Sequence, residues 1–220
     1  MKFATWNVNS LRVRLPHVLS WLDAEQPDIF ALQETKIPDP EFPAAEFLQR
    51  GYQLAFSGQK TYNGVAIISR TPLTGLQTEI PGFGDPQRRV LCAETRGIAV
   101  LNLYIPNGAE VGSEKYSYKL AWLEHMREFI RTLLARNPRL AVLGDFNIAP
   151  ADDDVHDPAA WAGQVLCSAP ERAAFTSFLD LGLVDCFRKF PQPPGSYSWW
   201  DYRAAGFQRN LGLRIDHILA

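Results

Sequence analysis

Polar side chains follow apolar, strand-like runs at five places along the chain, and each cluster carries oxygen or amide groups. The clusters are Asn7 after residues 3–6, Gln33 and Glu34 after 29–32, Tyr104 after 100–103, Asp145 and Asn147 after 140–143, and Asp216 after 213–215. Strand ends are where an α/β scaffold brings distant residues into one cleft. Carboxylate and amide oxygens suit a hard divalent cation. The pattern therefore predicts a metal-dependent phosphoesterase.

The segment from Gly144 to Asn147 is the strongest local signal. It places a carboxylate and a carboxamide two residues apart, directly after an apolar run. The carboxylate can accept or deliver a proton, and the amide can donate a hydrogen bond to a developing phosphorane oxygen. Each residue also has an ordinary explanation: Asp and Asn favour turns, Asn7 could cap a helix, and Tyr104 could be a half-buried phenol. Their recurrence after successive strands favours a site.

The elements that must position these groups alternate between strand-like and helix-like runs. Short apolar runs bounded by Gly, Pro, Asn or charge predict strands at 29–32, 64–69, 90–94, 98–105, from 140, at 197–200 and at 213–219. Apolar residues at three-to-four spacing predict helices from a Ser10 cap to just before Pro27, at 114–136 and at 172–181. Helices outside central mixed sheets are the natural packing of such elements.

Composition narrows the class of protein further. A chain of 220 residues with 46% hydrophobic content can form one large α/β domain. The formal net charge of −2 gives no general attraction to a polyanion, so nucleic-acid binding would need a local basic face. Three widely spaced cysteines indicate neither a disulfide framework nor a zinc knuckle. Without an apolar run of membrane-spanning length, we expect a soluble cytoplasmic protein with no membrane partner.

Eight short motifs occur in order along the chain. They are 5–9 (Thr-Trp-Asn-Val-Asn), 32–36 (Leu-Gln-Glu-Thr-Lys), 63–66 (Asn-Gly-Val-Ala), 87–89 (Gln-Arg-Arg), 104–108 (Tyr-Ile-Pro-Asn-Gly), 144–150 (Gly-Asp-Phe-Asn-Ile-Ala-Pro), 199–203 (Trp-Trp-Asp-Tyr-Arg) and 212–216 (Gly-Leu-Arg-Ile-Asp). In this order they resemble exonuclease III and its abasic-site endonuclease relatives. The resemblance implies a single endonuclease/exonuclease/phosphatase domain over residues 1–220. Its fold would be α/β, with two packed mixed β-sheets and helices on both outer faces, a DNase I-like four-layer sandwich.

The resemblance also implies an activity and a partner. The activity would be Mg²⁺-dependent hydrolysis of DNA phosphodiesters, with Mn²⁺ as a possible substitute. It would comprise incision 5′ to an abasic site and removal of nucleotides or blocking groups from 3′ ends. The partner would be double-stranded DNA containing abasic sites or 3′ ends, bound by a monomer that is nucleoid-associated in a bacterium.

Mapped motif by motif, the resemblance assigns roles to six residues. Those placed at the metal are Glu34 as principal ligand, Asn7 as ligand or orienting group, Asp145 and Asn147. Tyr104 would contact the scissile phosphate, and Asp145 would move a proton of the attacking water or the leaving oxygen. Asn147 would stabilise the transition state. Asp216 would hold a catalytic partner in place.

Basic and aromatic side chains near the motifs are candidates for DNA contacts. They are Lys60, Arg88, Arg89, Arg203 and Arg214 for phosphates, and Trp199 for the abasic pocket. For any single basic residue, a solvated surface position is an equally good explanation. Because neighbours on a strand face opposite sides, one of Trp199 and Trp200 should belong to the core.

The chain departs from the family at its C-terminal end. Family members carry a later Ser-Asp-His motif that residues 1–220 do not contain. We therefore expect missing C-terminal strands, an exposed sheet edge and impaired catalysis. Asp216 and His217 cannot both substitute, because adjacent strand residues face opposite sides. Two alternatives remain open: a phosphoesterase of the same fold with a non-DNA substrate, and a catalytically silent DNA-binding relative.

Overall fold

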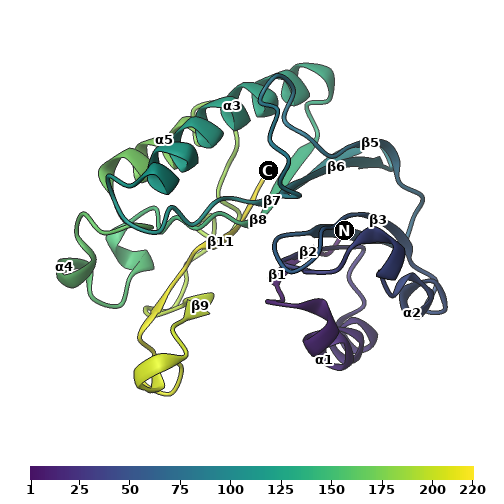
Figure 1. Ribbon diagram of the computed structural model, residues 1–220, viewed down its shortest axis with the longest axis horizontal. Helices are drawn as coiled ribbons and strands as arrows, with labels where there is room; N and C mark the ends of the chain where they lie inside the picture. Colours follow the sequence, from purple (N-terminus) through teal and green to yellow (C-terminus); the bar gives the residue numbers. More distant parts are fainter. The chain divides into compact units, whose positions relative to one another are not determined.

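The computed structural model describes residues 1–203 and 205–220. By internal contacts the chain forms two compact units (Figure 1). The first contains Met1–Tyr104 and Leu133–Asp145, and the second contains Ile105–Thr132 and Phe146–Ala220. The expectation of one domain over residues 1–220 stays a prediction.

No helix in the described residues combines the length and apolar character needed to cross a membrane.

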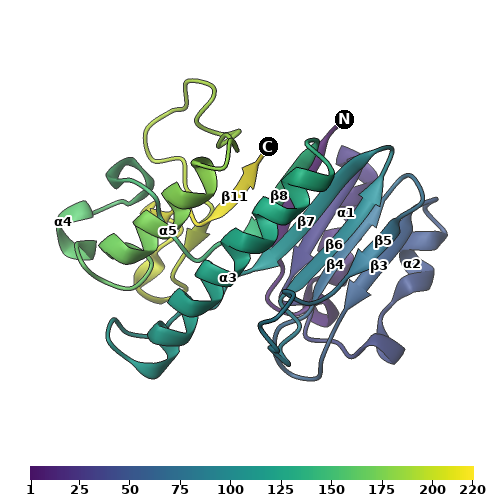
Figure 2. The same cartoon turned by 90° about the horizontal axis from the view of Figure 1, so that it is seen from above.

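The first unit holds strands of two mixed sheets. One sheet has the order β1 (Phe3–Asn7), β2 (Ile29–Gln33), β4 (Val65–Ser69), β3 (Gln53–Ser57), and the other contains, side by side, β8 (Leu140–Asp145), β7 (Ile98–Tyr104), β6 (Val90–Thr95) and β5 (Thr74–Gln77) (Figure 2). The β1–β2 and β7–β8 pairs are parallel, whereas the other pairs are antiparallel. Each parallel pair brings two carboxyl-terminal strand ends to the same edge, because parallel strands point the same way.

Two helices cover the outer face of the β1-β2-β4-β3 sheet (Figure 1). They are α1 (Leu11–Glu25) and α2 (Ala44–Leu48), with a 3₁₀ turn, η1 (Asp39–Glu41), before α2. Leu11, Val18 and Leu22 of α1 are fully buried in one cluster with Phe30 of β2 and Phe47 of α2. Burying such apolar surface supplies about 25 cal/mol per Å² and fixes the helices on the sheet.

A buried polar link joins the two sheets of the first unit. Gln33 and Asn102 are both 0% exposed, and the Gln33 amide nitrogen lies 2.7 Å from the Asn102 side-chain oxygen. The Asn102 amide nitrogen donates to the backbone oxygens of Leu32 and Ala66, both at 2.9 Å. Buried amides must be hydrogen-bonded, so the link fixes how β2 packs against β7. Glu34 follows Gln33 directly, and this packing therefore fixes where that carboxylate emerges.

The second unit contains helices and short strands joined by loops. Its elements are most of α3 (Glu114–Arg136), η2 (Asp152–Asp154), α4 (Pro158–Trp161), α5 (Ala169–Leu179), β9 (Trp199–Trp200), η3 (Arg203–Ala205), β10 (Gly212–Leu213) and β11 (Asp216–Leu219). The β9 and β10 strands pair antiparallel. Ala149, Val155, Leu213 and Ile215 form part of a buried cluster. This cluster fixes the loop after Asn147 against the segment before Asp216.

The predicted fold class is confirmed, as are the long helix at 114–136 and the strands at 29–32, 64–69, 90–94, 98–105 and from 140, to within about a residue or two at their ends. Two details differ. Ser10 precedes α1, but its side chain makes no capping hydrogen bond, and its backbone N–H instead donates to Glu34 O at 2.8 Å. The expected strand at 213–219 is interrupted, because Ser198 Oγ accepts the N–H groups of Ile215 and Asp216 and diverts them from a ladder.

Candidate active site

Four of the predicted site residues meet in the first unit. Asn7, Tyr104 and Asp145 end β1, β7 and β8, and Glu34 directly follows β2. The Asn7 amide nitrogen lies 2.8 Å from Glu34 Oε1 and 2.8 Å from Asp145 Oδ2. The Tyr104 hydroxyl donates to Glu34 Oε1 at 2.9 Å. Residues up to 138 positions apart in sequence therefore surround one point, as their positions after strands predict.

The backbone holds Glu34 in an uncommon conformation. Its φ of 53° lies in the left-handed region, which residues other than glycine seldom occupy. The next residue, Thr35, donates its N–H to Gly64 O at 3.1 Å, and Glu34 O accepts from Ser10. At Gly64 a Cβ would lie 2.2 Å from Thr35 Oγ1, so a larger residue would displace this turn. Such strain persists where surrounding structure over-determines it, typically at functional sites.

Ionisation states follow from the contacts of the cluster. Burial by itself would raise the pKa of Glu34, but hydrogen bonds from Lys36, Asn7 and Tyr104, with the Lys36 charge, together lower that pKa. Glu34 is therefore a carboxylate at neutral pH. Burial and the charges of Glu34 and Asp145 raise the pKa of Tyr104. The phenol therefore stays protonated and acts as a donor.

Asn7 presents its amide nitrogen to the carboxylates. Its side-chain oxygen accepts from the Asn9 N–H at 3.0 Å, which fixes the direction of the amide. In this orientation the Asn7 nitrogen donates to Glu34 and Asp145, and the Asn7 oxygen is engaged by the Asn9 N–H. Of the two roles predicted for Asn7, the geometry favours the orienting group over the metal ligand.

The acidic pair fits a divalent cation that keeps much of its water. Glu34 and Asp145 each place an oxygen within 2.8 Å of one amide nitrogen, so their carboxylates converge. In the described residues, 1–203 and 205–220, no group of three His, Cys, Asp or Glu side chains is arranged to hold a metal. Mg²⁺ suits a site with one or two carboxylates, because it retains several waters and takes substrate phosphate oxygens as further ligands.

Arg89, predicted to contact a DNA phosphate, packs against Tyr104. Its guanidinium lies 4.6 Å from the centre of the Tyr104 ring and donates to Tyr104 O at 3.2 Å. Its Nε donates to the Gln87 side-chain oxygen at 2.9 Å. This half-buried arginine therefore positions Tyr104 and has these donors engaged within the protein.

Asn147 lies in the second unit, with its side chain held at both ends. Its amide nitrogen donates to Ile105 O at 2.9 Å, and its oxygen accepts from the Asn107 side chain at 3.2 Å. Asn147 has a φ of 50°, a left-handed conformation that asparagine tolerates better than most residues. Both roles predicted for Asn147, at the metal and as a donor to the transition state, stay predictions.

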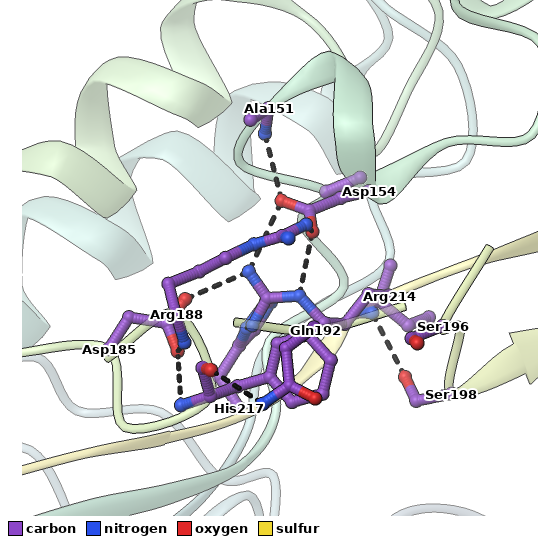
Figure 3. A network of polar contacts seen from close by, with 12 residues as sticks. Ala151, Asp154, Asp185, Arg188, Gln192, Ser196, Ser198, Arg214 and His217 are labelled. Atoms are coloured by element: carbon purple, nitrogen blue, oxygen red, sulfur yellow. Dashed lines mark hydrogen bonds and ion pairs between the residues drawn. The ribbon is translucent and has the colours of Figure 1, made fainter. Parts of the chain in front are cut away.

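Arg214 is buried, contrary to the DNA-contact role expected for it. It is 3% exposed, and its guanidinium forms ion pairs with Asp154 at 2.7 Å and Asp185 at 2.8 Å (Figure 3). Its NH1 lies 3.0 Å from His217 Nδ1. A guanidinium enclosed in this way cannot reach a DNA phosphate without breaking the network, so Arg214 is a structural residue.

Asp216 and His217 differ in burial, in line with the alternation of side chains along a strand. Asp216 begins β11 and is half-buried, whereas His217 is 2% exposed with Nε2 against Ile148 O at 2.9 Å. Burial and the nearby Arg214 charge lower the pKa of His217 to about 4. His217 is therefore neutral near pH 7. The prediction that Asn147 and Asp216 act with the first-unit cluster stays a prediction.

The other DNA-contact candidates lie at or near the surface. Lys60 is exposed, Arg88 makes a long 3.8 Å ion pair with Glu79, and the Arg203 side chain is 89% exposed beside Asp201. Both tryptophans are half-buried, so neither is a full core residue. Trp199 packs on the cluster around Val155, while Trp200 contacts Phe207 and donates to Asn210. These positions are compatible with phosphate and base contacts but do not test them.

Two residues make contacts that the sequence did not predict. Lys36 places its ammonium 2.8 Å from Glu34 Oε2 and 2.6 Å from Asn9 Oδ1. Asn107 orients Asn147. Both lie inside quoted motifs, two or three residues beyond a site residue, so their proximity in sequence was the available signal.

Carboxylates gathered at strand ends of two mixed sheets are the groups that a metal-dependent phosphoesterase site requires. The chain belongs to the Endonuclease/Exonuclease/phosphatase family, which matches residues 4–220. It is similar to an exodeoxyribonuclease of Bacillus subtilis (strain 168), with 37% identity over 228 residues, covering 100% of this chain and 87% of the relative. The family nucleases depend on a divalent metal ion.

Two solved structures extend the comparison. A 3′ phosphatase from Neisseria, bound to a product DNA hairpin, has a TM-score of 0.98 and 49% identity, covering 100% of this chain and 86% of that one. An AP endonuclease from Archaeoglobus fulgidus has a TM-score of 0.94 and 39% identity, with the same coverage of 100% and 86%. The fold is therefore shared with nucleases that the sequence motifs resemble.

Proposed function

We propose that this protein is a Mg²⁺-dependent nuclease that hydrolyses phosphodiester bonds of duplex DNA, by incision 5′ to abasic sites and by processing of 3′ ends. The observation that carries the proposal is the cluster of Asn7, Glu34, Tyr104 and Asp145 at strand ends in a chain of this family. Mn²⁺ would serve as a substitute, because both ions accept the same oxygen donors.

The roles of the residues follow from their ionisation and contacts. Glu34 and Asp145 would hold the cation, which when bound relieves negative charge on the phosphate oxygens. Asn7 keeps the two carboxylates oriented. Tyr104, protonated and braced by Arg89, would donate to the phosphate or to Glu34. Asp145 would move a proton at the attacking water or the leaving oxygen.

Roles are also proposed for residues outside this cluster. The Asn147 amide would stabilise negative charge on the transition state, which is worth about 10²–10³ in rate for one such donor in other enzymes. Asp216 would hold a catalytic partner. Lys60, Arg88, Arg203 and Trp199 would contact DNA, with each phosphate contact adding to the salt dependence of binding.

Processing of 3′ ends has specific support beside abasic-site incision. A solved structure 49% identical to this chain is described as a 3′-5′ exonuclease from Neisseria meningitidis, and another of equal identity as a 3′ phosphatase. The AP endonuclease from Archaeoglobus fulgidus is 39% identical. We therefore propose that 3′-end processing is a principal activity of this chain.

A substrate panel tests the proposal directly. Four substrates would be incubated with enzyme and Mg²⁺: a duplex with one tetrahydrofuran abasic analogue, an intact blunt duplex, a duplex with a recessed 3′ phosphate, and p-nitrophenyl phosphate. We expect cleavage at the lesion and at the 3′ end, abolished by EDTA. Hydrolysis of p-nitrophenyl phosphate alone would point to a non-DNA phosphoesterase. DNA binding without metal-dependent cleavage would point to a silent relative.

A further inference from the structure

A buried ion pair lies beside Asn147 in the second unit. Lys119 of α3 and Glu171 of α5 are both 0% exposed, and their Nζ and Oε1 atoms lie 2.5 Å apart. Taking two charges out of water is expensive, and an apolar pair of similar volume is often as stable or more stable. The pair therefore calls for an explanation beyond holding two helices together.

The lysine also contacts the loop that carries Asn147. Its ammonium donates to Asn147 O at 2.7 Å and to Asn107 O at 3.1 Å. These two carbonyls and the Glu171 carboxylate are all acceptors, as an ammonium group, which only donates, requires. The same two asparagines are joined through their side chains, by the 3.2 Å bond from Asn107 to Asn147. Lys119 therefore holds both backbones whose side chains interact.

Glu171 in turn holds the lysine in place. Its Oε2 accepts from the Ser168 N–H at 3.1 Å and the Ser168 hydroxyl at 2.6 Å, and its Oε1 accepts from the Leu166 N–H at 3.1 Å. The Ser168 hydroxyl also lies 2.6 Å from the Tyr116 hydroxyl of α3. Contacts from two helices and two loops thus hold one ammonium group, and the Lys119 side chain has little freedom to move.

Packing around the lysine stem restricts it further. Gly108 has a φ of 94°, and a Cβ there would lie 3.1 Å from Lys119 Cδ and 3.3 Å from Val165 Cγ2. The stem therefore occupies a close-fitting space between the turn after Asn107 and the loop before α5. A side chain of another length would move the carbonyl contacts.

We infer that Lys119, fixed by Glu171, is a positioning residue that sets the conformation of Asn147 through its backbone oxygen and through Asn107. This inference rests on the proposed role of Asn147 in catalysis. The left-handed φ of 50° at Asn147 has a strain that the ammonium–carbonyl contact offsets. With the backbone held, the Asn147 amide keeps one direction, as electrostatic stabilisation of a transition state requires.

The test separates positioning from stability. The variants are Lys119→Met, which leaves Glu171 without this partner, and Lys119→Met/Glu171→Gln, which removes both charges together. Lys115, exposed on the same helix, gives the matched control Lys115→Met. For each protein we would measure urea unfolding, and kcat and KM on the abasic duplex. The side-chain amide signal of Asn147 would be followed by ¹H–¹⁵N NMR.

We expect Lys119→Met to lose stability and the double variant to regain most of it. In the double variant kcat should stay at least tenfold below wild type while KM changes less than threefold, and the Asn147 amide signal should shift. Lys115→Met should match wild type in all three measurements. Lys119→Arg keeps the charge but changes the length of the side chain, so kcat should also stay below wild type.

Recovery of kcat together with stability in the double variant would overturn the inference, because the pair would then be structural alone. An unmoved Asn147 amide signal would overturn it equally. If wild-type protein cleaves no DNA substrate, the proposed function fails, and the amide signal by itself decides whether Lys119 positions Asn147.

Discussion

Two ionic clusters in this molecule are built from the same kinds of group but differ in charge balance and burial. At the strand ends of the first unit, Glu34 and Asp145 converge beside the ammonium of Lys36, and the Glu34 side chain is 18% exposed. In the second unit, Asp154 is 0% exposed and is paired with two guanidinium groups, those of Arg214 and Arg188. The first cluster retains negative charge that a cation can neutralise, whereas the second satisfies its charge internally.

The difference shows how charge can distinguish function from structure. Carboxylates gathered on a shared point repel each other and stay together because the backbone over-determines them, as the left-handed Glu34 illustrates. For carboxylates surrounded by arginines, the removal of one partner destabilises the fold strongly, because it leaves an uncompensated buried charge. We therefore expect substitutions in the first cluster to change chemistry and substitutions in the second to change stability.

The largest expected effect is that of Glu34→Gln on catalysis. Removing one of the two converging carboxylates should lower metal-dependent cleavage of the abasic duplex by about 10³–10⁴-fold, because charge stabilisation by a bound metal is worth several kcal/mol. The melting temperature should change little, because the substitution also removes the repulsion between Glu34 and Asp145. Single-turnover kinetics measures the rate, and thermal unfolding measures the stability. Glu124→Gln, exposed on α3, is the control, and a Glu34→Gln rate within threefold of wild type would remove this cluster from the mechanism.

Asp154→Asn should show the opposite pattern. It leaves the buried Arg214 guanidinium without a carboxylate that now lies 2.7 Å away, and breaking one partner of a buried pair costs about 3–5 kcal/mol. Urea unfolding should therefore show a loss of about 3 kcal/mol, while the rate per folded molecule falls less than it does for Glu34→Gln. Equal losses of rate in the two variants would contradict the division between the clusters.

The sequence predicts the first cluster better than the second, for a physical reason. Asn7, Glu34, Tyr104 and Asp145 follow apolar runs, so strand periodicity and chain direction place them at one edge of the sheets. Arg214 carries no comparable local signal, because a charge within an apolar run can face solvent or a buried partner. Its partners lie 60 and 29 positions away, in segments whose paths depend on tertiary packing.

The same distinction explains which elements of the fold were predictable. The long helix α3 and the apolar strands β2, β4, β6, β7 and β8 have strong periodic or continuous apolar patterns. The exposed strand β5, with little buried surface, and the short helix α2 gave no such pattern. Lys119 was missed although it lies four residues before the buried Leu123, a spacing that places it on the apolar face of α3.

His217, which contacts Arg214 of the second cluster, makes the stability of the fold depend on pH. Its pKa of about 4 in the folded state lies below the ordinary value of 6.5, so between these values the unfolded chain binds the proton and the folded chain does not. Stability should be fully present above pH 6.5 and fall as the pH drops toward 4, by up to about 3 kcal/mol. Urea unfolding at pH 4.5–7 should show this slope for wild type and for the surface variant His125→Gln. It should be flatter in His217→Gln, and an unchanged slope there would assign the effect to other groups.

Tyr104→Phe should have the smallest effect on rate and stability. It tests whether Tyr104 serves catalysis, as expected for the first cluster, or the fold, as expected for the second. The substitution keeps the ring that packs under Arg89 and removes the hydroxyl that donates to Glu34 at 2.9 Å. One hydrogen bond to a charged group contributes about 1.5–3 kcal/mol, but water can replace part of it because Glu34 is partly exposed. We therefore expect kcat to fall about tenfold with KM for DNA nearly unchanged, and stability to change by less than about 1 kcal/mol. A stability loss as large as that of Asp154→Asn would show that Tyr104 supports the fold in the manner of the second cluster, and the contrast between the clusters would then rest on Glu34 and Asp145.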